Sequence, residues 1–168
     1  MRRKDREIVD FSKIEKIISL AGYLHLGMYD EGYPYVVPLH YGYFFENKKP
    51  VFFVHCAKEG HKLECIKKNN NVFVEIDRAV NIIAADTPCK YGAEYECVMC
   101  RGKATVLTDE EEKLKGLKLL MKTQTGKDFE IPAVSAETVT VIRIVIGHQH
   151  PAESLFFQFF DIFFDHDF

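Results

Sequence analysis

VFFVHCAKEGHKLECIKK (residues 51–68) predicts a strand, a tight turn and a short helix in direct succession. Residues 51–56 are mostly apolar, as expected for a buried strand. The apolar spacing then changes to a helical one, with Leu63 and Ile66 on one side of a helix that starts near Gly60. The stretch therefore predicts that a helix begins directly after a buried strand.

The predicted helix start is a candidate anion site. Backbone N–H groups at a helix start have no partner within the helix and carry partial positive charge, so they bind phosphate readily. Lys58, His61 and Lys62 add basic side chains at the same place. A solvated, charged turn would have the same composition. The local chemistry therefore indicates a phosphate site and leaves the simpler interpretation open.

The rest of the chain predicts hairpin-connected strands with few helices. Ser12 with Glu15 and Thr108 with Glu111 are spaced as capping boxes at two helix starts, and Gly126 ends the second helix. Expected helices cover residues 12–21, 60–68 and 108–125, and expected strands cover residues 23–29, 33–45, 51–56, 72–76, 95–107 and 138–146. This order favours an antiparallel barrel with helices packed outside it.

Three local features qualify the strand assignments. Pro34 and Pro38 lie inside residues 33–45, so at least one of them is expected at a strand start, an edge or a bulge. Gly102 is a candidate bulge within residues 95–107. Residues 78–90 are compatible with strand, loop or both.

Composition narrows the class of protein. The chain has 168 residues, the size of one ordinary domain, and a net charge of −3, so no overall basic field would attract nucleic acid. No apolar run is long enough to span a membrane, and the charged N-terminus does not resemble a signal peptide. We therefore expect a cytoplasmic protein whose five cysteines are free thiols.

No metal site is predicted. Cys97 and Cys100 lie three residues apart in an expected strand and so point to opposite faces, which suits neither zinc nor a disulfide. His148 and His150 form a lone H-Q-H pair. His25 lies in an apolar run and is expected to be a structural histidine, in the core or at an interface.

Four blocks of the sequence resemble the nitroimidazole-resistance (Nim) family of pyridoxamine 5'-phosphate oxidase-like flavin proteins. The blocks are MRRKDREI, GYPYVVPLHYGY, FFVHCAKEGHKLECI and YECVMCRGKATVLTDEEEKLKGLKLLMK, at residues 1–8, 32–43, 52–66 and 95–122. The resemblance implies a mainly β, antiparallel, Greek-key-like split barrel over residues 1–146. It also implies a homodimer that binds FMN at its interface. The Phe-rich tail, residues 147–168, departs from the family pattern. Either it packs on an apolar surface, on its own domain or on a second subunit, or it is an atypical end without a function.

The resemblance also implies which residues contact the cofactor. Lys58, His61 and Lys62 match positions that contact phosphate, and His61 is also the candidate proton donor. The remaining matched positions are Val37, Pro38, Leu39 and His40 on the strand behind the flavin ring, His55, Cys56 and Ala57 on the strand beside it, and Val98 and Arg101 on a strand that approaches from the other subunit. Because side chains alternate along a strand, only one pair out of residues 37–40 can face the ring.

The implied activity is an FMN-dependent oxidoreductase that passes electrons to a small organic or nitroaromatic acceptor. Two alternatives remain open. No general base or nucleophile is clearly placed, so a flavin-binding or flavin-storing module without turnover is possible. A heme-binding member of the same fold is the other alternative, with His25 or His61 as the axial ligand.

Overall fold

The structure, a computed structural model, describes residues 8–147 and 155–161, and eight strands within these ranges form one antiparallel sheet. The sheet order is β2-β1-β5-β6-β7-β4-β3, and β8 pairs with β6. The strands are β1 (Leu24–Asp30), β2 (Tyr33–Leu39), β3 (Tyr41–Glu46), β4 (Lys49–Cys56), β5 (Asn71–Ile83), β6 (Gly92–Val106), β7 (Thr140–Ile146) and β8 (Leu155–Asp161). The mainly β, antiparallel architecture expected from the sequence is confirmed.

The two edges of this sheet are joined by one residue. The strand path begins with β2 and ends with β3, which follow each other in the chain with only His40 between them. The sheet therefore curls until its edges come close, although β2 pairs only with β1 and β3 only with β4. This is a barrel with a split along one side, as expected.

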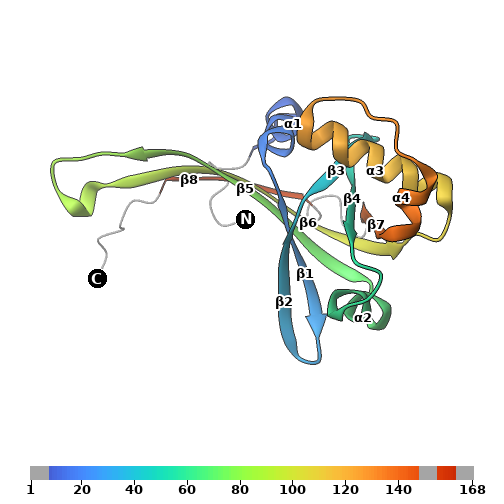
Figure 1. Cartoon of the computed structure of the whole chain (residues 1–168). Helices are drawn as coiled ribbons and strands as arrows, with labels where there is room; N and C mark the ends of the chain where they lie inside the picture. The colour runs from blue at the N-terminus through green and yellow to red at the C-terminus, as the bar shows by residue number, and fades with distance from the viewer. Residues whose placement is uncertain (1–7, 148–154, 162–168) are drawn as a thin grey trace.

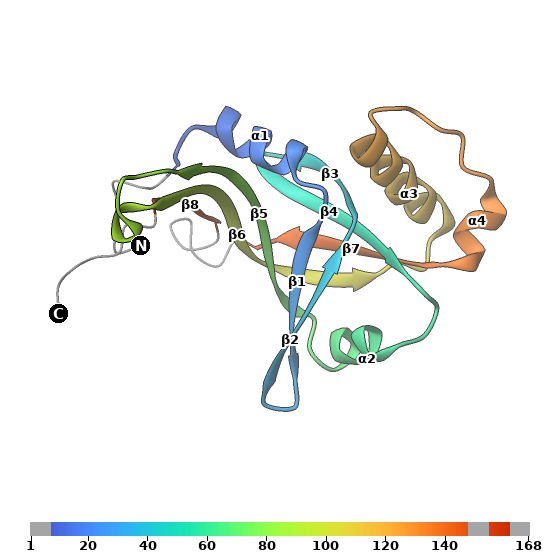
Figure 2. The same ribbon diagram turned by 60° about the vertical axis from the view of Figure 1, so that its left-hand side comes forward.

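Helices lie on two sides of the sheet (Figures 1 and 2). Helices α1 (Phe11–Leu20) and α3 (Glu110–Thr125) lie on one side, and α2 (His61–Lys68) lies on the other, near the β1–β2 hairpin. A 3₁₀ turn, η2 (Pro88–Lys90), and a short helix, α4 (Ala133–Thr138), complete the described elements. No helix among the described residues is long and apolar enough to cross a bilayer.

Both capping boxes expected from the sequence are wrong by one or two positions. Asp10 caps α1 and accepts a hydrogen bond from the Ser12 backbone N–H at 3.0 Å. Asp109 caps α3 and accepts from the Glu112 backbone N–H at 2.8 Å. In each case a carboxylate lies beside the expected hydroxyl residue, in extended backbone where its oxygens reach the first free N–H groups. Gly126 ends α3 with φ 72°, as predicted.

The expected strand over residues 33–45 is two strands, because the chain turns at His40. Pro34 and Pro38 both lie on β2, an edge strand, where an outward-facing position needs no N–H for the ladder. The expected bulge at Gly102 is wrong, since the β5–β6 register runs through it without a shift. Glycine is needed there for space: a Cβ would lie 2.8 Å from the Val145 carbonyl oxygen.

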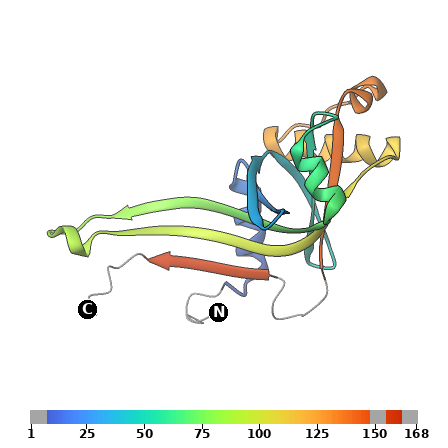
Figure 3. The ribbon, with the colours of Figure 1, turned by 90° about the horizontal axis from the view of Figure 1, so that it is seen from below.

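The long hairpin of β5 and β6 extends away from the rest of the protein (Figures 1 and 3). Residues 78–90, left open above, continue β5 to Ile83 and then form η2. Strand β8 runs beside the extended part of β6, so residues 155–161 of the Phe-rich tail pair with the chain's own sheet. Residues 1–7, 148–154 and 162–168 lie outside the described residues, and so do His148 and His150.

The main core fills the barrel between α1 and the sheet. It includes Ile17, Leu24, Leu26, Tyr41, Phe52, Val74, Ile76, Ile142 and Ile144, all at most 1% exposed. All five cysteines are free thiols, and Cys97 and Cys100 are among the buried ones. The core thus fixes the barrel and leaves the split and the outer face of the sheet for binding.

Candidate functional site

The β4–α2 turn forms a helix start without a side-chain cap. Gly60, the residue before α2, has φ 143° and ψ 160°, which side-chain-bearing residues rarely adopt. The backbone N–H groups of Leu63 and Glu64 bond to the Gly60 carbonyl, and no side chain accepts from the first turn. The first-turn N–H groups can therefore receive an anion from solvent.

Lys62 adds positive charge beside the end of β4. It is half-buried and close enough to His55 and Cys56 to affect both groups. Partial burial lowers the pKa of His55, and nearby His40 and Lys62 lower it further. Burial raises the pKa of the Cys56 thiol, against the opposing effect of Lys62. His55 and Cys56 therefore lie next to Lys62, with His40 close by.

His61 points toward the β1–β2 hairpin. Its Nε2 lies 2.7 Å from Oδ2 of Asp30, its Nδ1 lies 3.6 Å from Oε2 of Glu64, and its ring meets Tyr35 edge-on at 5.0 Å. The hydrogen bond and charge of Asp30 raise the pKa of His61 above its usual value. The exposed imidazole therefore tends to keep a proton, which is held at Nε2 against Asp30.

Lys58 borders a groove that Lys62 does not line. This groove of about 670 Å³ lies between α2 and β6, and Lys67, Lys68 and Thr105 also line it. The three basic residues of the turn therefore have three surroundings: Lys62 beside β4, His61 against Asp30, and Lys58 in this groove. The sequence had suggested one compact cluster.

The alternation along β2 separates the four matched residues into two pairs. Val37 and Leu39 are half-buried and pack against the main core, as do Cys56 and Leu63 from β4 and α2. Pro38 and His40 are exposed on the opposite face. The apolar pair therefore lies at the split, on the same side as the end of β4.

His40 is fixed at the corner between β2 and β3. Its Nδ1 lies 2.9 Å from the Gly22 carbonyl oxygen and 3.1 Å from Oε1 of Gln124, so Nδ1–H is the donor. Gln124 in turn donates to the Tyr41 carbonyl at 2.9 Å. The described residues provide no hydrogen-bond partner for Nε2 of His40.

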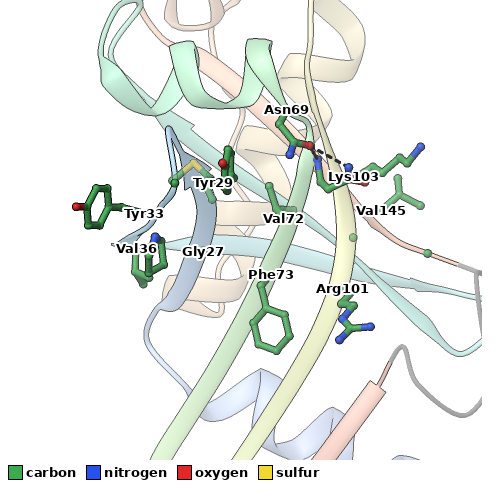
Figure 4. Close-up of a pocket in the computed structure, with 16 residues that line it drawn as sticks. Gly27, Tyr29, Tyr33, Val36, Asn69, Val72, Phe73, Arg101, Lys103 and Val145 are labelled. Carbon is green, nitrogen blue, oxygen red and sulfur yellow. Dashed lines mark hydrogen bonds between the residues drawn. The ribbon is translucent and has the colours of Figure 1, made fainter.

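The two matched residues of β6 lie on opposite faces of the sheet. Val98 is fully buried in the main core, so only its backbone can approach a ligand. Arg101 is exposed and lines a groove of about 1150 Å³ on the outer face, with Tyr33, Val36 and Phe73 (Figure 4). Of the other matched residues, His55 and Ala57 are exposed near the start of α2.

Sequence reasoning missed this groove and the partners of the histidines. The groove joins residues from β1, β2, β5 and β6, and only the pairing of the strands brings them together. One signal was available in the sequence. The buried positions of β5 alternate, and Phe73 is a large aromatic residue at a position between them, on the outer face. Asp30 and Gln124 gave no local signal. Asp30 contacts His61, which is 31 residues away, and Gln124 contacts His40, which is 84 residues away.

Comparison with known proteins agrees with this fold. Residues 10–149 match the family model described as pyridoxamine 5'-phosphate oxidase. No curated protein matches the chain significantly. A structure from Bacteroides thetaiotaomicron, described as a 5-nitroimidazole antibiotic resistance protein, is 30% identical with a TM-score of 0.74, over 92% of this chain and 87% of that one.

Two more distant structures share the fold. An FAD- and heme-binding protein from Mycobacterium smegmatis is 11% identical with a TM-score of 0.72, over 91% of this chain and 72% of that one. The flavocytochrome Anf3 from Azotobacter vinelandii is 15% identical with a TM-score of 0.65, over 96% and 82%. The family match covers most of the chain, and the chain therefore belongs to the pyridoxamine 5'-phosphate oxidase family, on the side of the nitroimidazole-resistance proteins.

Proposed function

We propose that the protein binds FMN at the split of the barrel, with the phosphate at the start of α2. The observation that carries this proposal is the uncapped helix start behind Gly60, with Lys62 beside it. A phosphate there would receive backbone N–H groups and a lysine charge together. The family of the chain and the flavin in the names of the Mycobacterium smegmatis and Azotobacter vinelandii proteins support a flavin as the ligand.

The residues at the split fit a flavin ring. Val37, Leu39 and Cys56 offer half-buried apolar contacts, and the outer side of β2 has no strand beside it to use its backbone groups. His40, whose side chain lies on the opposite face, would contact the flavin through its backbone. Bound FMN would supply electron and hydride transfer. His61, protonated against Asp30, would hold a proton for an acceptor near the flavin.

We further propose that the site is completed in a homodimer. The outer-face groove offers Tyr33, Val36 and Phe73 as exposed apolar contacts and Arg101 as a cation. A second subunit placed over this face would bring Arg101 toward the flavin of its partner. Sedimentation of the flavin-loaded protein tests this proposal, and a monomer at micromolar concentration would contradict it.

The proposed activity is transfer of electrons through FMN to a small organic acceptor, such as a nitroaromatic compound. The support is the 30% identical structure, which is described as a nitroimidazole resistance protein. Anaerobic mixing with NADH or NADPH should bleach the flavin, and a nitroimidazole should then restore its colour. If neither nicotinamide reduces the flavin, the protein is a flavin-binding module without this turnover.

Flavin binding is tested by the visible spectrum of the purified protein and by titration with FMN. Lys62→Ala should weaken FMN binding by about 1.5–3 kcal/mol, or roughly 10- to 150-fold in Kd, because a hydrogen bond to a charged group is lost. Lys67→Ala, on the same helix but in its last turn, is the matched control and should bind normally. Absence of FMN binding, or a Soret band of heme instead of flavin bands, would refute the proposal.

A further inference from the structure

Four side chains of metal-binding types meet on the outer face of three adjacent strands. His25 of β1 lies directly opposite Glu75 of β5, and Asp77 of β5 lies directly opposite Cys97 of β6. Glu75 and Asp77 are two residues apart on one strand, so their side chains share a face. Directly opposite residues on paired strands have Cβ atoms only about 5 Å apart. The pairing alone therefore gathers all four side chains.

The atoms that could bind a metal are close together. Nδ1 of His25 lies 2.8 Å from Oε2 of Glu75 and 3.7 Å from Oδ1 of Asp77. Sγ of Cys97 lies 3.1 Å from Oε1 of Glu75. One ligand atom from each of His25, Glu75 and Asp77 can be chosen so that all three lie within 4.8 Å of one another. Small rotations of these three side chains would place their ligand atoms around a single ion, and Cys97 reaches the group through its contact with Glu75.

The cluster has more negative charge than its neighbours neutralise. Among the described residues, no lysine or arginine lies within salt-bridge distance of Glu75 or Asp77. His25 is therefore the one basic side chain found beside the two carboxylates. Cys97, the fourth candidate ligand, is only 5% exposed and lies on the protein side of the cluster. His25 and Asp77 are accessible to solvent. A divalent cation could enter from solvent and balance the charge.

We propose that His25, Glu75, Asp77 and Cys97 bind a divalent transition-metal ion, with zinc as the best match. One imidazole nitrogen, one thiolate and carboxylate oxygens form the mixed donor set that zinc accepts in four-coordinate sites. On binding, the Cys97 thiol loses its proton to solvent and His25 binds as the neutral imidazole. The site is separate from the residues proposed for FMN, and flavin binding does not depend on it.

The position of the cluster suggests a structural role for the ion. His25 and Glu75 form the last pair between β1 and β5, and beyond them β5 pairs only with β6. The cluster thus lies where β1 stops pairing with β5 and the β5–β6 hairpin continues without it. An ion there would tie β1 to both strands of the hairpin and restrain the base of the hairpin.

The test uses the full chain after chelator treatment, with Zn²⁺ in calorimetry and Co²⁺ as an optical probe. We expect zinc binding at micromolar concentration or below and a thiolate-to-cobalt charge-transfer band in difference spectra against the cobalt-free sample. Cys97→Ser should abolish the band. Asp77→Asn, a mild change at an exposed position, should weaken zinc binding at least about tenfold, as even indirect partners of a metal do.

Cys65→Ser is the matched control. Cys65 is another buried thiol, and it lies with His61 and Asp30 in the second group of potential ligands. The proposal requires that Cys65→Ser keep the cobalt band and the zinc affinity. Absence of zinc binding, or a band lost in Cys65→Ser and kept in Cys97→Ser, would overturn the proposal.

Discussion

Replacing Gly60 with alanine should either lower the free energy of unfolding or weaken the binding of FMN. Gly60 has φ 143° and ψ 160°, in a region that only glycine adopts without strain, and the penalty for another residue is about 1–3 kcal/mol. A Cβ at Gly60 would meet nothing within 4 Å, so steric overlap adds nothing to this penalty. The magnitude therefore comes from backbone strain alone.

The penalty divides between stability and ligand affinity. If the turn keeps its conformation in the variant, the free energy of unfolding falls by about 1–3 kcal/mol, which corresponds to about 2–12 °C in Tm for a chain of this size. If the turn relaxes instead, stability is spared and the strain is imposed when FMN binds, so that Kd rises by up to about 150-fold. The two losses together should amount to about 1–3 kcal/mol.

The assays are thermal unfolding without flavin and titration with FMN. Gly22→Ala is the matched control, because a Cβ there also meets nothing within 4 Å and the residue has no positive φ. It should change either quantity by less than about 0.5 kcal/mol. If Gly60→Ala matches the wild-type protein in both Tm and Kd, then the turn does not need glycine and the reasoning about the helix start fails.

Gly42→Ala should lower the free energy of unfolding by about 3 kcal/mol in denaturant titrations, because its Cβ would lie 2.2 Å from a backbone nitrogen of α3; an unchanged midpoint would contradict this packing. Tyr41→Phe should cost about 1–3 kcal/mol in the same assay, since two backbone carbonyls near the end of α1 lose their buried donor. Asp30→Asn tests the raised pKa of His61. Because the folded-state pKa lies above the unfolded value of about 6.5, the contact stabilises fully below that pH and is lost as pH rises through the folded pKa. The Tm difference from wild type should be largest near pH 6 and vanish in alkaline buffer, and a difference that grows with pH would show that the sign is wrong.

Local patterns in the sequence predicted most of the elements in their order, but neither α4 nor β8. The period change after Gly60 located α2, and the alternation of Val72, Val74 and Ile76 identified the buried face of β5. The starts of α1 and α3 were less predictable, because each has a carboxylate and a hydroxyl residue nearby and either type can cap a helix. The turn at His40 had no glycine to mark it, so two strands were expected to be one.

The candidate site was predictable only where its residues are neighbours in the chain. The helix start could be found because backbone geometry and basic side chains occur within a few positions. The contact of His61 with Asp30 crosses 31 residues, and that of His25 with Glu75 crosses 50. Such contacts depend on strand register, which one sequence does not reveal. This is why no metal site was expected from the sequence.

Strand β7 also sets the order in which the chain can fold. It pairs with β4 on one side and β6 on the other, and its pairing with β4 joins residues about 90 positions apart, such as Val51 with Val145. Until residues 140–146 leave the ribosome, β4 and β6 have no strand to join them, and both present unpaired edges. Pairing of such distant segments slows folding and prolongs exposure to aggregation. Newly made chains should therefore depend on chaperones most during the last part of synthesis.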